Sequence, residues 1–295
     1  MQNAESDSLG RATFHHIPPR DDVRPTAREA RWFQFIARHG PQSSQTLFEL
    51  TQDTHRCKDT ALRSLQRLRA AGCLRLPVQQ RATERAEFHP YIYDLTERGK
   101  RHLVDQGCDH WPFRPTGHWW HAYRVGQVTA SIDMAAARFG VRYIPAHEIL
   151  ARKGTDIAIP LGTSKLIPDQ LFALDYGGRY RAFVLEVDRG TEPKSSPANR
   201  KSWARSLDQY DRALDKGLFH TRYGLKARVL VLWVVNTRSD QLTLLEMIAA
   251  RGAKLGQSVL VSRVSLQETA PYRPEPRWFT GSWLRVGGEV VSIAN

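Results

Sequence analysis

The sequence predicts a mixed α/β (α+β) chain of two domains, a small helical domain followed by a larger domain with a mixed sheet. Between residues 26 and 105, three helix-like segments precede a pair of strand-like runs. After residue 119 the order is helix, three strands, helix, strand, helix. The length of 295 residues also suits two domains. The predicted boundaries are a flexible leader at 1–25, the first domain at 26–105, a linker at 106–118, the second domain at 119–262 and an extension at 263–295 packed on the core.

The composition favours a cytoplasmic protein with a polyanionic partner. A formal net charge of +13 and a pI near 10.0 favour nucleic acid, with a merely solvated basic surface as the alternative. The sequence has no apolar run of ~18 residues and no apolar signal core at its start, so we expect no membrane segment. Its cysteines, Cys57, Cys73 and Cys108, are odd in number and widely spaced, which favours a reducing compartment over a disulfide framework.

The first domain begins with three predicted helices. AREARWFQFIARH (27–39) places large apolar side chains on one face, and Gly40-Pro41 ends it. A short helix follows from Ser44 through Thr51, and HRCKDTALRSLQRLRAAG (55–72) forms a longer one. Three helices at this spacing are typical of a helix-turn-helix.

The third of these helices has an apolar side and a basic side. Its apolar residues Leu62, Leu65 and Leu68 share one face at ~100° per residue. Arginine on the other face can pair with guanine edges or with phosphates, as a recognition helix requires. The alternative is a surface helix with a solvated basic face. The residues of this segment predicted to contact DNA are Arg56, Lys58, Thr60, Arg63 and Arg67.

The segment after these helices is typical of a two-stranded wing. CLRLPVQQ and the strand in HPYIYDLTERGKRHL flank a polar turn, with Arg81 and Arg85 near its tip as further predicted DNA contacts. The run YDLTERGKRHL resembles the end of many bacterial winged-helix domains, in which a threonine, here Thr96, caps the helix that follows the strand. We therefore expect a winged helix-turn-helix that binds duplex DNA, with protein binding as the alternative.

The second domain is predicted to hold a mixed sheet flanked by helices. HAYRVGQVTASIDMAAARFG is a helix, and VRYIPAHEIL, LIPDQLFALDY and RYRAFVLEVD are strands, the last two joined at Gly177-Gly178. NRKSWARSLDQYDRALDKG is a helix, ARVLVLWVVN is a buried strand, and SDQLTLLEMIAARG is a helix. In the extension, WLRVGGEVVSI predicts a hairpin that turns at Gly287-Gly288. Trp278, Phe279 and Trp283 are expected to anchor it on the core, with base stacking as the alternative.

Acidic residues stand at the ends of two neighbouring predicted strands. Asp169 follows Pro168, and Glu186 and Asp188 follow a buried run two residues apart. This pattern resembles the PD-(D/E)XK nuclease superfamily, which implies a restriction-endonuclease-like domain whose acids hold Mg²⁺ or Mn²⁺ beside the scissile phosphate. By this resemblance Asp169, Glu186 and Asp188 are the expected metal ligands and catalytic residues. A surface salt bridge at a strand end is the alternative.

The superfamily normally carries a lysine two residues after the second acid, and Asp188 stands at that position here. Three explanations stay open: a site with three carboxylates, a lysine that substitutes from elsewhere, or loss of cleavage with DNA binding retained. Lys194 and Lys201 are the nearest lysines in sequence, and Lys201 is the catalytic candidate. The basic helix that follows adds Arg200 and Arg205 as predicted DNA contacts.

The whole pattern, over roughly residues 26–250, is similar to the replication-relaxation family. It combines the winged helix, a helix opened by His121, the "PD" pair, the run LEVDRGTE and a basic helix with a tyrosine. The resemblance implies a bacterial plasmid or an integrated mobile element. We expect a replication or mobilisation accessory protein that binds double-stranded DNA and has a degenerate nuclease-like domain. The alternatives are an active Mg²⁺-dependent endonuclease or nickase and a transcription regulator. Other replication or mobilisation proteins and a second copy of the chain, in a homodimer, are further candidate partners.

Overall fold

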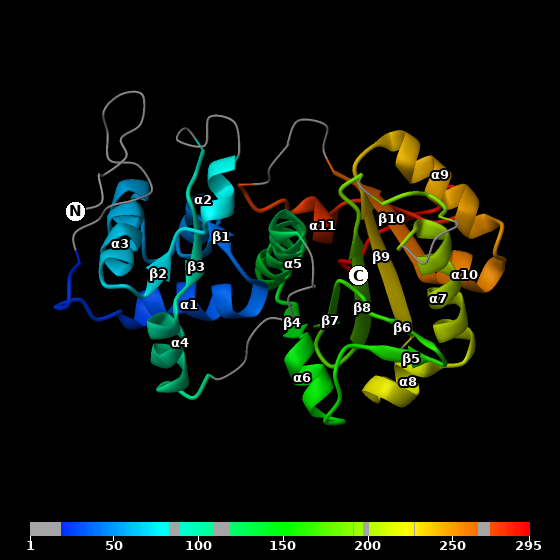
Figure 1. Cartoon of the computed structure of the whole chain (residues 1–295), viewed down its shortest axis with the longest axis horizontal. Helices are drawn as coiled ribbons and strands as arrows, with labels where there is room; N and C mark the ends of the chain where they lie inside the picture. Colours follow the sequence, from blue (N-terminus) through cyan, green and yellow to red (C-terminus); the bar gives the residue numbers. More distant parts are fainter. Residues whose placement is uncertain are drawn as a thin grey trace. The chain divides into compact units, whose positions relative to one another are not determined.

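The computed structural model describes residues 19–82, 89–108, 118–190, 192–196, 201–226, 228–264 and 272–295 (Figure 1). It confirms the predicted mixed α/β class, with a helical N-terminal region followed by a domain that contains a large mixed sheet. The chain divides into two compact units. The first comprises Met1–Pro112 with Pro271–Pro274, and the second Phe113–Ala270 with Glu275–Asn295.

The N-terminal unit contains the three helices predicted from the sequence and also the predicted helix that Thr96 caps. Thr26 and Glu29 form a reciprocal capping box at the first helix, and Gly40 ends it with a φ of 84°. The third helix begins at Lys58, three residues later than predicted, so Arg56 lies before it. The bounds are α1 Ala27–His39, α2 Ser44–Leu50, α3 Lys58–Ala70 and α4 Glu97–Val104.

Three short strands pack beside these helices, in the order β1-β3-β2. They are β1 Gln42–Ser43, β2 Leu74–Arg75 and β3 Ile92–Leu95, both outer strands being antiparallel to β3. The strand predicted for CLRLPVQQ is much shorter than expected, because proline at position 77 cannot extend the ladder and a 3-10 helix, η1 Val78–Ala82, follows. Gln80 instead bonds β3 with its side chain, through Ile92 N (2.9 Å) and Ile92 O (2.9 Å).

The junction between β3 and α4 is a close contact of backbones. Thr96 caps α4 by accepting from Gly99 N (3.2 Å), and its hydroxyl donates to Cys73 O (3.0 Å). A Cβ at Gly99 would lie 2.3 Å from Cys73 O. Position 99 therefore requires glycine for steric reasons, since the Cys73 carbonyl belongs to the backbone and cannot move aside as a flexible side chain could.

The second unit is built on a seven-stranded sheet in the order β12-β11-β10-β9-β8-β7-β4. The pairs β8–β9 and β9–β10 are parallel, and the remaining neighbours are antiparallel. The bounds are β4 Arg142–Pro145, β7 Gln170–Asp175, β8 Tyr180–Val187, β9 Val229–Val235, β10 Val259–Arg263, β11 Trp283–Leu284 and β12 Val290–Val291.

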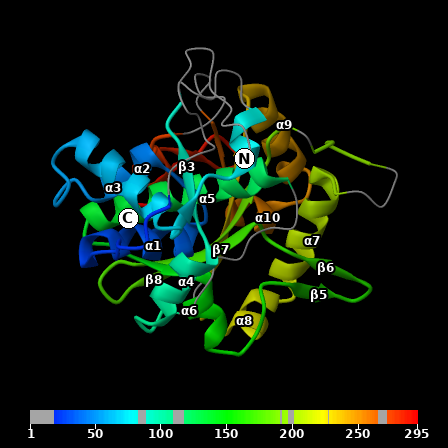
Figure 2. The ribbon, with the colours of Figure 1, turned by 60° about the vertical axis from the view of Figure 1, so that its left-hand side comes forward.

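Helices cover both faces of this sheet (Figures 1 and 2). On one face, α5 and α11 pack on the side chains of β7–β10 that point towards that face, such as Phe183 and Leu232. On the other face, α7 to α10 pack on the alternate residues, such as Val184 and Val231, with α6 at the β4 end. The bounds are α5 Trp119–Arg138, α6 Ala146–Ala151, α7 Trp203–Asp215, α8 Leu218–Tyr223, α9 Arg238–Ala249, α10 Ala253–Ser258 and α11 Arg277–Thr280.

Several predicted elements of this unit need correction. VRYIPAHEIL is not one strand, because only residues 142–145 form β4 and the following residues form α6. The strand predicted for LIPDQLFALDY begins only at Gln170. A separate hairpin of β5 Ile159–Leu161 and β6 Ser164–Leu166 precedes it, and the sequence analysis did not predict this hairpin. None of the described helices combines the length and the apolar composition needed to cross a bilayer.

The C-terminal extension completes the sheet and the core. β11 and β12 pair in the predicted hairpin, with Gly287 and Gly288 at its turn. Trp283 and Phe279 are each 0% exposed within the cluster that α5 covers. Anchoring on the core, which the sequence favoured over base stacking, is therefore what these aromatic residues do.

Candidate functional site

The candidate site lies at the end of the β7–β8 pair, where the strand register brings two acids together. Gln170 pairs with Leu185, so the next position along the same pair sets Asp169 opposite Glu186. Both residues are nearly buried, at 4% and 3% exposure. Both follow the alternation that turns Val184 and Leu171 towards the α7 face of the sheet.

Asp169 is held by two donors. Its Oδ2 accepts from Val187 N on the neighbouring strand (2.8 Å), which fixes the carboxylate at the strand end. Its Oδ1 lies 3.0 Å from His121 Nε2, contributed by the first turn of α5. Because His121 is 48 positions away in the sequence, only the fold reveals this pair.

Glu186 is held by one side chain of α7 and one from the segment just before this helix. Its Oε1 accepts from the Tyr210 hydroxyl (2.6 Å), and its Oε2 accepts from Lys201 Nζ (3.1 Å). Tyr210 is itself fully buried in the core beneath the helix. The glutamate therefore sits at the boundary between the apolar core and a polar pocket.

Lys201 is the cation on which the acids converge. Besides Glu186, its Nζ lies 3.0 Å from Glu192 Oε1 and 3.8 Å from Asp169 Oδ1. The lysine side chain is 45% exposed while the two strand acids are buried, so it closes the site from the solvent side. Lys201 therefore lies beside both acids, although it follows Glu186 by 15 positions in the sequence.

The surroundings perturb the ionisation of these groups. Burial and the nearby Asp169 charge raise the pKa of Glu186 to about 7, despite the opposing effect of Lys201. Burial would also raise the pKa of Asp169, but the hydrogen bond from His121 and the charge of Lys201 outweigh it and hold that pKa below its ordinary value. Burial disfavours the charged form of His121, yet Asp169 reverses the effect and raises the histidine pKa.

Asp188 has a different role from the other two acids. Its Oδ2 accepts from the Trp203 indole N–H (2.8 Å), and its Oδ1 accepts from Gly190 N (2.8 Å). Gly190 has a φ of 75° and lies against Asn236, so this turn needs glycine. The structure thus uses Asp188 to join the end of β8 to the start of α7, and does not gather it with Asp169 and Glu186.

A pocket of about 440 Å³ opens beside the acids. Asp169, Glu186 and Lys201 line it together with Lys165 of β6 and Arg205 of α7. The remaining lining residues are Thr163, Ser164, Leu166, Ile167, Pro168, Ser206 and Gln209. An acidic centre with a basic rim is an arrangement that can take a phosphate and a cation together.

The two acids fit a hard divalent cation in oxygen type but offer few ligands. Asp169 Oδ2 and Glu186 Oε1 accept from Val187 N and the Tyr210 hydroxyl, so a metal would take Asp169 Oδ1 and Glu186 Oε2, which now meet His121 Nε2 and Lys201 Nζ. Within the described residues, no group of three His, Cys, Asp or Glu side chains is arranged to hold a metal ion. Mg²⁺ is commonly bound through one or two carboxylates, with waters and substrate phosphates, so the pair fits such an ion in the type and number of its oxygens.

The predicted DNA contacts are distributed over both units. Arg56, Lys58, Thr60, Arg63 and Arg81 are exposed on the N-terminal unit, and Arg205 is half-buried in the pocket wall. Arg67 forms an ion pair with the fully buried Glu29 of α1, and its side chain is 38% exposed. Arg85 and Arg200 lie outside the described residues. Whether any of them contacts DNA stays a prediction.

Sequence reasoning did not assign four residues that build this site: His121, Glu192, Tyr210 and Lys165. Glu192 belongs to the LEVDRGTE run and could have been proposed from that run alone. Tyr210 follows Trp203 at helical spacing, which indicated only a core position. His121 entered the sequence analysis only as the residue that opens a helix in the family pattern, and Lys165 carries no local signal, because elements far apart in the sequence bring them to the site.

The fold and the site together define a class: a mixed-sheet α/β protein with one buried acidic pair, closed by a lysine, at the end of two adjacent strands. A sequence model described as Replication-relaxation matches residues 33–229. The chain belongs to the replication-relaxation family. Neither the curated proteins nor the solved structures gave a match to this chain.

Proposed function

We propose that this replication-relaxation protein is a DNA-binding accessory factor for the replication or mobilisation of a bacterial plasmid or integrated mobile element. The observation that carries the proposal is the division of α3 into two faces. Ala61, Leu65 and Leu68 are 0% exposed, while Lys58 and Arg63 are exposed on the other side. A helix packed by one face and cationic on the other suits the DNA major groove.

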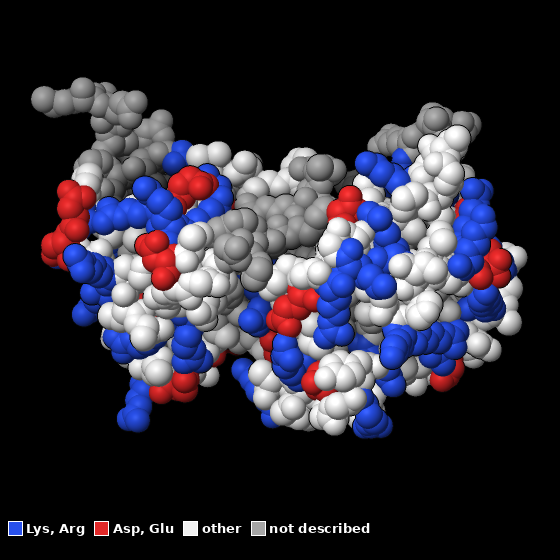
Figure 3. All heavy atoms as spheres, turned by 90° about the horizontal axis from the view of Figure 1, so that it is seen from below, with Lys and Arg blue, Asp and Glu red and all other residues white. Residues whose placement is uncertain are grey.

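The arrangement around α3 supports a winged helix. α2 and α3 are consecutive helices joined by residues 51–57, and β2 and β3, which follow them, pair antiparallel. Lys and Arg side chains are spread over the face of the molecule shown in Figure 3, with smaller groups of Asp and Glu between them. Such a surface adds sequence-independent affinity for the phosphate backbone.

Fluorescence anisotropy with a labelled 30-base-pair duplex in EDTA tests this proposal. Arg63→Glu and Lys58→Glu are expected to weaken binding by tenfold or more each, because each turns a phosphate or base contact into a repulsion. Arg101→Glu, an equal charge change on exposed α4, is the matched control and should cost less than threefold. Equal losses in all three variants would show that α3 is not the reading surface.

A second function, Mg²⁺-dependent DNA cleavage, is favoured by the convergence of Asp169, Glu186 and Lys201. Lys201 stands where the missing motif lysine would be useful, close to both acids rather than two residues after the second. When bound, a divalent ion supplies charge neutralisation at phosphorus and an acidified water. Asp169 and Glu186 would hold it, and Lys201 would face the phosphate.

Conversion of supercoiled plasmid in Mg²⁺ or Mn²⁺ tests the second function. Nicked or linear product is expected from the wild type and not from Asp169→Asn, Glu186→Gln or Lys201→Ala. Asp188→Asn should retain cleavage, because its carboxylate bonds Trp203 and Gly190 instead of the acidic pair. If the wild type gives no product while duplex binding is intact, the acidic pocket is not a cleavage site and the nuclease-like domain is degenerate.

A further inference from the structure

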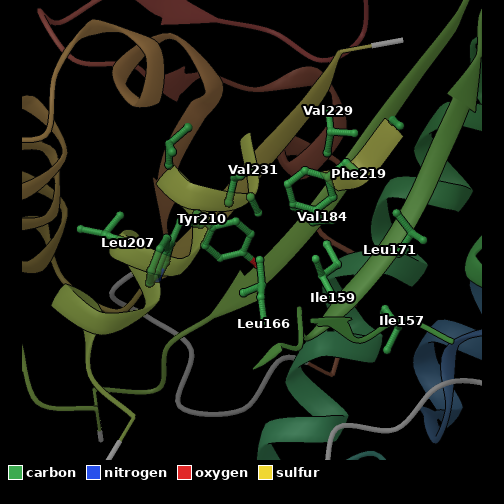
Figure 4. Close-up of a cluster of buried hydrophobic side chains, with 14 of the residues drawn as sticks. Ile157, Ile159, Leu166, Leu171, Val184, Leu207, Tyr210, Phe219, Val229 and Val231 are labelled. Atoms are coloured by element: carbon green, nitrogen blue, oxygen red, sulfur yellow. The ribbon is translucent and has the colours of Figure 1, made fainter. Parts of the chain in front are cut away.

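The β5–β6 hairpin forms one wall of the acidic pocket and is firmly held there. Ile159 and Leu166, one from each strand, turn into the same apolar cluster as Leu207 and Tyr210 of α7 (Figure 4). The α7 side also bonds the hairpin directly, since Gln209 Nε2 donates to Lys165 O (3.2 Å). The hairpin is therefore a fixed part of the pocket.

The alternation of β6 determines what the hairpin presents to the pocket. Leu166 is 2% exposed and faces the core, so the preceding Lys165 side chain points away from the core. Thr163, Ser164 and Lys165 all line the pocket, which gives this wall two hydroxyls and a cation. The nearby Asp156 carboxylate is engaged by Arg222 (2.6 Å).

A second cation lies across the pocket on α7. Arg205 lies four residues before Gln209, so the two side chains share one face of the helix about 6 Å apart. Because Gln209 bonds the Lys165 backbone, Arg205 stands one helical turn from the hairpin, and both cations line the same pocket. Lys165 and Arg205 are the cations that line the pocket in addition to Lys201, whose Nζ lies 3.1 and 3.0 Å from the Glu186 and Glu192 carboxylates.

We propose that the β5–β6 hairpin and α7 form a binding subsite for one phosphodiester of a DNA strand, beside the acidic pair. Lys165 and Arg205 contact its non-bridging oxygens, and Ser164 donates a hydrogen bond from its hydroxyl. The proposal rests on the DNA binding proposed above and assigns to this hairpin the placement of the strand next to Asp169 and Glu186. It requires neither a bound metal nor cleavage.

Photo-crosslinking of the full chain to DNA tests the subsite. p-Benzoylphenylalanine replaces Thr163 at the exposed hairpin turn, and the same residue replaces Tyr180 in a matched control. Tyr180 is 55% exposed and begins β8, about 20 Å along the strand from Glu186. Irradiation of a labelled 30-mer in EDTA should crosslink position 163 at least fivefold more than position 180. In the chain with p-benzoylphenylalanine at position 163, the additional substitution Lys165→Glu should lower the crosslinking yield fivefold or more. The additional substitution Lys165→Arg should preserve that yield.

The outcomes separate this subsite from the proposed function. Intact duplex binding with equal yields at the two positions, or with no effect of Lys165→Glu, overturns the subsite and leaves DNA binding standing. If the wild-type chain does not bind the duplex, both the proposed DNA binding and the proposed subsite are wrong. A fivefold preference for position 163 that Lys165→Glu removes establishes the hairpin as the DNA contact.

Discussion

Asp169 and Glu186 face each other across adjacent strands, yet their surroundings shift their pKa values in opposite directions. The Asp169 carboxylate accepts hydrogen bonds from Val187 N and from His121 Nε2, and these bonds stabilise its anion. Glu186 is buried against Tyr210 and close to the charge of Asp169, which disfavours a second anion. Two close carboxylates with different pKa values are common at functional sites of proteins.

The raised pKa of Glu186 has a consequence for stability. In the unfolded chain its carboxyl ionises near pH 4.5, whereas in the fold it keeps its proton until about pH 7. The folded state therefore loses stability as the pH rises between these values, by roughly 2–3 kcal/mol. Glu186→Gln removes this loss, so in EDTA its free energy of unfolding relative to wild type should increase between pH 5 and pH 8. Urea denaturation at both pH values measures the effect.

Glu246→Gln is the control for this pH dependence, because Glu246 is exposed on α9 and the same chemical change there should leave the difference from wild type constant. The lowered pKa of Asp169 acts only at acid pH, with stability lost as the pH falls through its folded pKa, so it does not enter this window. A Glu186→Gln difference that is flat from pH 5 to pH 8 would contradict the assignment.

Gly99 offers a prediction about backbone packing. Gly99→Ala should destabilise the chain by about 2 kcal/mol, because the new methyl would lie 2.3 Å from Cys73 O. Gly256→Ala is a matched change within α10, whose Cβ would meet Val286 at 3.5 Å, an ordinary contact. It should be neutral or stabilising by up to ~1 kcal/mol. Thermal unfolding compares the two variants, and a lower midpoint for Gly256→Ala than for Gly99→Ala would refute the argument.

At the residue scale, the sequence allowed Asp169, Glu186 and Lys201 to be proposed together, and the structure brings both acids within 4 Å of the Lys201 Nζ atom. The sequence did not allow Asp188 to be separated from Asp169 and Glu186. Residues i and i+2 of a strand share a face, so spacing alone groups Glu186 with Asp188. Only the position of Trp203, which depends on how α7 packs, decides where the Asp188 carboxylate bonds.

At the element scale, the C-terminal hairpin closes the core of the second unit. Trp283 is 0% exposed on β11, whereas Val290 on the paired strand β12 is 61% exposed. Trp283→Ala should cost about 4 kcal/mol through lost burial and a cavity, and Val290→Ala less than ~0.5 kcal/mol. Urea midpoints would show the contrast. Similar midpoints for the two variants would mean that the hairpin is not part of the cooperative core.

The elements that the sequence analysis missed are short or lack a periodic pattern. β5 and β6 have three residues each, too few for an alternation to be recognised. The segment containing α6 was merged with β4 because its apolar residues continue the preceding run, with only proline at the boundary. The long helices α1, α5 and α7 were recognisable because several turns repeat the same apolar spacing.

At the scale of the whole molecule, a net charge of +13 is the property on which we base the proposal that both units bind DNA. Exposed Lys58 and Arg63 belong to the first unit, and Lys165 with Arg205 to the second. A protein with cations on both units should bind duplex DNA with an affinity that falls as counterions are added, with a slope of about −0.9 per phosphate contacted.

The most direct test of the central claim is the affinity of the intact chain for a duplex, measured in EDTA from 50 to 200 mM salt. Four or more phosphate contacts predict a linear fall of log affinity with log salt, about 100-fold over this range. Binding that is absent at 50 mM salt, or that does not change across the range, would contradict a DNA-binding role for this protein.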